Sequence, residues 1–117
     1  MTRAVPWLLR DGTVLASLEV AATRDARRRG LLGREGIEGA LLIDPAKSVH
    51  TMGMRFAIDV AHLADDGTVL RTATMAPNRI GRPILGAAKV LEAEAGVFRH
   101  WELAPGQVLE VREGEGE

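Results

Sequence analysis

The chain has 117 residues, of which 46% are hydrophobic and 26% are charged, and its formal net charge is -1. This length supports one domain, and the balanced charge gives no overall attraction to nucleic acid or to an anionic membrane. The absence of cysteine excludes disulfides, thiolate zinc sites and a cysteine nucleophile. The N-terminal residues lack the pattern of a signal peptide, and no apolar run is long enough to span a membrane. We therefore expect a cytoplasmic protein without a membrane partner.

The first third of the chain predicts a hairpin and a short helix. Asp11-Gly12 separates two apolar segments, and this dipeptide supplies the positive φ angles of a tight turn. In the second segment Val14 and Val20 fall on one face by period two, which predicts a half-buried strand. Thr23 is suited to capping a helix, and we expect that helix to end near Gly33.

Further strands are predicted along the rest of the chain. Residues 39–44 form an apolar run that ends before a proline, and a second Asp-Gly pair at 66–67 predicts a long hairpin. Apolar patterning then predicts a strand within 87–96, a helical turn within 96–102 and a last strand within 107–112. We expect one domain over residues 1–112, with an acidic, disordered tail at 113–117. The predicted fold is mostly β, a compact antiparallel β-sandwich or open barrel with one or two short helices.

The segment SVHTMGMRFAIDV, residues 48–60, carries polar groups within a strand-like pattern. If it were one continuous strand, His50 and Asp59 would point to opposite faces, roughly 30 Å apart. Gly53 changes this expectation because glycine inside a strand pattern often marks a bulge or a bend. A bend there would fold His50 and Thr51 back toward the following strand. Whether these residues share a site therefore depends on Gly53.

The leading functional hypothesis is a small-ligand-binding domain without catalytic activity. A polar ligand would meet apolar walls in this region, and guanidinium groups of the arginines there would suit a carboxylate or a phosphate. The alternative for these arginines is pairing with Asp59, Glu92 or Glu94 across strands. The candidate ligand-binding residues are His50, Thr51, Met54, Arg55, Asp59 and Arg79.

Two other classes of function remain open. An enzyme would use His50 as an acid or base, oriented by Asp59, on a small anionic substrate. A protein-interaction domain would instead present an exposed sheet edge. We expect no metal and no cofactor, because no H-x-H or HExxH spacing occurs. The arginines between 24 and 34 spread around a helix rather than lining one face, so we expect no nucleic-acid partner.

Several segments resemble the DUF192 family, also called UPF0127, of uncharacterised bacterial and archaeal proteins. The matching segments are RRRGLLGR (27–34), GALLI, VHTMGMRFAIDVAHLADDGTVL (49–70), the P-x-R at 77–79, AAKVLEAEAG and PGQVLEV. The resemblance implies a compact, mostly β domain of sandwich or open-barrel type with a short helix, and it implies no particular reaction. Two positions depart from the family pattern. Ala57 stands where the family usually has proline, and Asn78 stands where it often has an aromatic residue.

Overall fold

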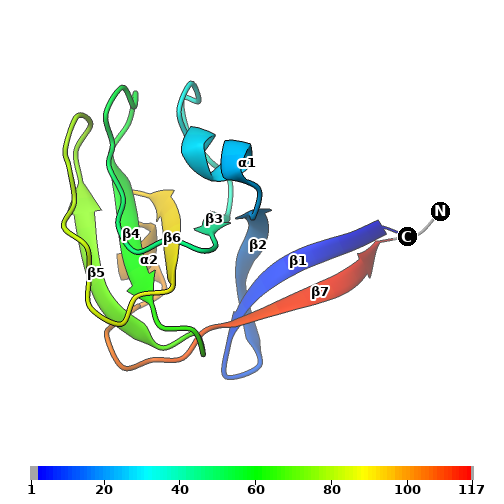
Figure 1. The fold of residues 1–117 in the computed structure, drawn as a ribbon. Coiled ribbons are helices and arrows are strands. Elements are labelled where there is room, and N and C mark those ends of the chain that lie inside the picture. Colours follow the sequence, from blue (N-terminus) through cyan, green and yellow to red (C-terminus); the bar gives the residue numbers. More distant parts are fainter. Residues whose placement is uncertain (1–2, 117) are drawn as a thin grey trace.

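In the computed structural model, which describes residues 3–116, the chain forms seven strands and two short helices (Figure 1). The strands are β1 (Arg3–Arg10), β2 (Thr13–Ala21), β3 (Ala40–Ile43), β4 (Ile58–Leu63), β5 (Val69–Met75), β6 (Lys89–Glu94) and β7 (Glu110–Gly116). The helices are α1 (Arg24–Arg29) and α2 (Val97–His100). The expected mostly β fold with short helices is therefore confirmed.

All of these strands belong to one sheet, in the order β5-β4-β6-β3-β2-β1-β7. Within residues 3–116 the two outer strands, β5 and β7, do not pair, so the sheet is not closed into a barrel. Neighbouring strands are antiparallel except β2 and β3, which are parallel and connected through α1. This crossover was not expected from the hairpin signals, because it joins segments that are separated along the chain.

The strands β1 and β7 form a long ribbon that projects from the rest of the molecule (Figure 1). Their pairing extends from Leu9 opposite Glu110 to Arg3 opposite Gly116. Secondary structure thus continues through residues 113–116 of the expected acidic tail, because their backbone groups pair with β1. Glu117 lies outside the described residues.

The predicted hairpin of β1 and β2 is confirmed, with Asp11 and Gly12 at φ angles of 50° and 79°. The expected inward face of β2 is not, because Val14 and Val20 are both exposed. The register of β1 and β2 shifts at a bulge, and β2 then changes its partner to β3 at Leu18. Each change interrupts the simple alternation of faces along the strand.

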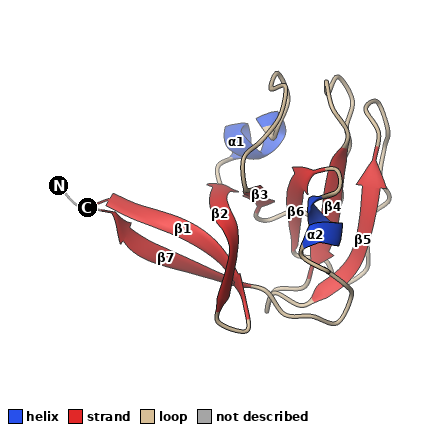
Figure 2. Ribbon diagram, turned by 180° about the vertical axis from the view of Figure 1, so that it is seen from behind, coloured by secondary structure: helices blue, strands red, loops and turns tan. Residues whose placement is uncertain are grey.

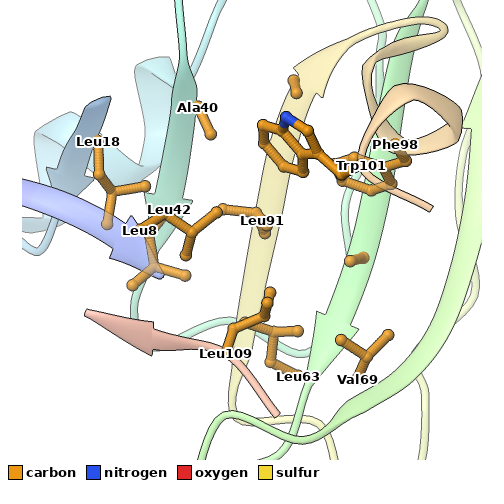
Figure 3. Packing of buried hydrophobic residues seen from close by; sticks show 12 residues of the cluster. Leu8, Leu18, Ala40, Leu42, Leu63, Val69, Leu91, Phe98, Trp101 and Leu109 are labelled. Carbon is orange, nitrogen blue, oxygen red and sulfur yellow. The ribbon is translucent and has the colours of Figure 1, made fainter. Parts of the chain in front are cut away.

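The central strands β3 and β4 and the middle of β6 are buried on both faces. Figure 2 shows α2 beside β4 and β6, and α1 beyond the end of β2. One hydrophobic core lies on the side of α2 and includes the stacked rings of Phe98 and Trp101 (Figure 3). We call the other the α1-side core, and its buried residues are Ala21, Leu31, Leu41, Ile43, Met54, Ile58, Val60 and Val90.

Helix α1 begins as expected, because the Thr23 hydroxyl accepts the backbone N–H of Ala26 at 3.1 Å. It ends earlier than expected, at Gly30 rather than near Gly33. Gly30 has a φ of 48°, which glycine adopts more readily than other residues. The chain then turns inward and buries Leu31 in the α1-side core.

Candidate functional site

The segment from 48 to 60 bends instead of forming one strand. The Met54 N–H donates to the Thr51 carbonyl at 3.1 Å, across a turn in which Gly53 has a φ of 77°. That φ favours glycine, so the chain does bend at the position where the sequence left the question open. The bend places His50 in an isolated antiparallel bridge with the loop that follows β5.

Thr51 fixes the bend to that loop. Its side chain is completely buried, and its hydroxyl donates to the Ala76 carbonyl at 2.6 Å and accepts the Arg79 N–H at 2.9 Å. Asn78 adds a second contact, because its side-chain oxygen accepts the Gly53 N–H at 2.9 Å. The polar side chain at position 78 therefore supports the turn itself.

Glu92 is a buried carboxyl in the middle of the sheet. Only 2% of the residue is exposed, and its neighbours across β3 and β4 are Leu41 and Val60, which are both apolar. Within residues 3–116 the carboxyl forms no ion pair, and burial alone raises its pKa from 4.5 to about 7. The carboxyl oxygens are not fully enclosed, because within residues 3–116 the fully buried polar side-chain atoms without a partner are the two ring nitrogens of His62. The Glu92 oxygens thus remain accessible from the cavity beside them.

The Glu92 side chain faces a cavity between β6, the end of α1 and the bend. A Cβ atom placed on Gly30 would lie 4.0 Å from Oε1 of Glu92, so the carboxyl lies close to the end of α1. The cavity has a volume of about 100 Å³. We call it the Glu92 cavity, and its lining includes Leu31, Ile43, Val49, His50, Met54 and Glu92.

Two of the predicted site residues, His50 and Met54, thus line the Glu92 cavity. Met54 is buried and belongs to the apolar wall. His50 is exposed, and its Nδ1 accepts the Met52 N–H at 3.2 Å. In the neutral imidazole this leaves the proton on Nε2, which can donate to a ligand. The cavity therefore offers a carboxyl and an imidazole at one site.

Asp59 lies on the opposite face of the sheet from this cavity. One of its oxygens accepts the backbone N–H groups of Gly96 and Phe98 at 2.9 and 3.0 Å, and the other accepts the Thr74 hydroxyl at 2.7 Å. Asp59 thereby caps the start of α2. It lines a different hollow from His50, so the bend at residue 53 does not bring the two side chains into one cavity.

The remaining predicted residues are arranged around the bend without converging on the cavity. Thr51 holds the backbone, as described above. Arg55 is exposed and pairs with Glu35 at 3.5 Å. Arg79 is also exposed, and its guanidinium donates to the carbonyls of Pro77 and Asn78 in its own loop at 3.5 and 3.3 Å.

The sequence indicated Glu92 only as a possible ion-pair partner for arginines. Its position in the lining of a cavity was not predicted. A signal was present, since the segment KVLEAE alternates so that Glu92 shares a face with Val90, an apolar residue. Alternation alone could not show that this face is buried, because Glu94 on the same face is exposed. The neighbours from β3 and β4 decide the burial, and those strands are distant along the chain.

Two general features of the described residues bear on the class of site. No group of three or more His, Asp or Glu side chains within residues 3–116 is placed to hold a metal ion. In the same part of the chain, neither helix is long and apolar enough to cross a membrane.

The fold is shared with solved structures of low sequence identity. A protein of unknown function from Novosphingobium aromaticivorans has a TM-score of 0.74 and 18% identity, covering 91% of this chain and 83% of its own. A candidate transcription regulator from Sinorhizobium meliloti has a TM-score of 0.68 and 19% identity, covering 95% and 94%. At such identities these structures show the fold alone.

The curated proteins contain no match to this chain. A model of the family DUF192, described as Uncharacterized ACR, matches residues 8–111. This match extends from β1 to β7 and includes the bend, the Glu92 cavity and both helices. The chain therefore belongs to the DUF192 family.

Proposed function

We propose that this domain binds a small polar ligand in the Glu92 cavity. The observation that carries the proposal is the buried carboxyl of Glu92, which lacks an ion-pair partner within residues 3–116 and faces a cavity that His50 also lines. A ligand that hydrogen-bonds this carboxyl would offset the cost of burying it. A cytoplasmic location remains a prediction from the sequence.

The volume of the cavity limits the size of the ligand. About 100 Å³ is smaller than the pockets of about 300 Å³ or more that hold drug-sized molecules. It corresponds to the liquid volume of about three water molecules, at about 30 Å³ each. We therefore expect a ligand, or the buried end of a ligand, with only a few non-hydrogen atoms.

Amide NMR of the wild-type protein with a mixed panel of small amines, alcohols, sugars and organic acids tests the proposal. We expect at least one compound to shift the amides of Gly30, Met54 and Glu92 in a saturable way. His50→Ala should weaken that response. Ser48→Trp places a large ring at an exposed position of the cavity lining and should abolish it. If no compound in the panel moves these amides, the proposed function is wrong.

An enzyme is the second candidate, and a specific observation favours it. A carboxyl with a pKa of about 7 can both donate and accept a proton near neutral pH, and His50 lines the same cavity. In this version Glu92, rather than Asp59, acts with His50. Conversion of a ligand identified by NMR into a product, lost in Glu92→Gln, would favour the enzyme over simple binding.

A further inference from the structure

We infer that the ligand of the Glu92 cavity carries a positive charge, in the form of a small primary ammonium group, and that the Glu92 carboxylate is its partner. The inference rests on the proposed function, because it names the ligand class of the same cavity. It follows from which charges and hydrogen-bond acceptors surround the carboxyl.

No cation of the described residues neutralises Glu92. The charged or titratable residues that line the cavity are, besides Glu92 itself, His50 and the three arginines at the end of α1, whereas β3 and β4 oppose Glu92 with Leu41 and Val60. None of these arginines contributes to the pKa of Glu92, which burial alone raises. A guanidinium close to the carboxyl would lower that pKa. The cavity therefore contains an acid that has no ion-pair partner within the described residues.

Within the described residues, none of these arginines forms an ion pair with Glu92. The Arg27 guanidinium donates to the carbonyl of Ala22 at 2.8 Å, near the end of β2. Arg28 and Arg29 are exposed to solvent, where water and salt screen their charges over about 8 Å at physiological ionic strength. They line the cavity together with Glu92 but keep their exposure to solvent.

The part of the cavity near Gly30 also provides acceptors for more than one N–H group. A Cβ atom on Gly30 would lie 4.0 Å from both Glu92 Oε1 and the carbonyl oxygen of Arg27. A carboxylate oxygen and a backbone carbonyl oxygen thus both lie close to this glycine. An ammonium group has three N–H donors, and its hydrogen bond to a carboxylate is stronger than one between neutral groups.

The apolar walls suit a short alkyl group attached to that ammonium. Leu31, Ile43 and Met54 line the cavity together with Val49. Methylammonium and ethylammonium are small enough for a volume of about 100 Å³. An anion of the same size would lie beside the Glu92 carboxylate, which would disfavour it there although three arginines also line the cavity.

Amide NMR titrations with methylammonium, at about pH 8 so that Glu92 is ionised, test the inference. Methanol is the neutral probe of matched size, acetate is the anionic probe, and sodium chloride keeps the ionic strength constant. Glu92→Gln keeps the shape of the side chain and removes its charge. Glu94→Gln, two residues further along β6 and exposed, is the matched control.

We expect methylammonium to shift the amides of Gly30 and Glu92 saturably, with at least about tenfold weaker binding in Glu92→Gln and unchanged binding in Glu94→Gln. Methanol and acetate should leave these amides unmoved. Equal responses to methanol or acetate, or unweakened binding in Glu92→Gln, would overturn the inference about charge while the cavity remained a ligand site. No response to any of the three probes would also overturn it, whereas the proposed function fails only if the whole mixed panel is silent.

Discussion

Glu92 and Asp59 show that two buried carboxyls in one sheet can have unrelated roles. Asp59 accepts three hydrogen bonds, two of them from the backbone at the start of α2. Glu92 has apolar neighbours on both adjoining strands and faces a cavity. The Asp59 carboxylate stabilises the fold through these hydrogen bonds, whereas the Glu92 carboxyl is available to bind a ligand.

The carboxyl of Glu92 predicts a specific dependence of stability on pH. The unfolded chain loses this proton near pH 4.5, whereas the folded chain keeps it until about pH 7. Stability therefore falls by about 3 kcal/mol as pH rises through this window. Relative to wild type, Glu92→Gln should gain about that much between about pH 4 and about pH 8, as measured by urea denaturation. A pH-independent difference between the two proteins would contradict the assignment, and Glu94→Gln serves as the control.

At the scale of elements, Asp59 joins β4 to α2. Replacing it with alanine leaves the N–H groups of Gly96 and Phe98 without their acceptor, which should cost about 3 kcal/mol or more of stability. Substitution of the exposed Asp65 with alanine should change stability little by comparison. Chemical denaturation measures both. If Asp59→Ala is as stable as Asp65→Ala, the capping role is wrong.

Thr51 joins the bend to the loop that follows β5. Thr51→Val keeps the shape of a fully buried side chain and removes the hydroxyl that contacts Ala76 and Arg79. We expect a loss of about 2 kcal/mol in the free energy of unfolding and altered amide shifts at His50. Thr13→Val, the same change at an exposed position, should alter neither the free energy of unfolding nor the amide shifts at His50. Unchanged His50 shifts would show that the hydroxyl does not position the bend.

The elements themselves could largely be predicted from the sequence, because their signals are local. Asp11-Gly12 specifies a turn through its own backbone preferences. Thr23 caps a helix through a hydrogen bond to the N–H of Ala26, only three residues along the chain. The sequence raised a bend at Gly53 as one of two alternatives, because glycine inside a strand pattern often marks a bend. The residues that the bend brings together depend on strand pairing, which no local pattern specifies. Hence His50 was identified as a candidate, while its cavity neighbour Glu92 was not.

At the scale of the whole molecule, the two cores bury the central strands of the sheet, where few positions tolerate charge. His62 on β4 illustrates the cost, because both of its ring nitrogens are buried without a partner. Burial, and then the charge of Arg71, lowers its pKa. The folded state thus favours the neutral ring, so stability should fall as pH drops below the ordinary His value of 6.5.

This loss at low pH is separable from the Glu92 effect, which has the opposite sign. Replacing His62 with leucine should remove the loss of stability below pH 6.5, and the same change at the exposed His100 should preserve it. Denaturant midpoints across this pH range provide the measurement. An unaltered profile in the His62 variant would mean that this ring titrates equally in the folded and unfolded chains.

The most direct test of the account is the titration of the Glu92 side-chain carboxyl itself, followed by ¹³C NMR. A largely buried carboxyl that forms no ion pair in the described chain should titrate at about 7, and its midpoint should fall when methylammonium binds beside it. A midpoint at the ordinary value of 4.5, unmoved by methylammonium, would show that solvent or another group already satisfies the carboxyl. The cavity would then have no unmet charge for a ligand to recognise.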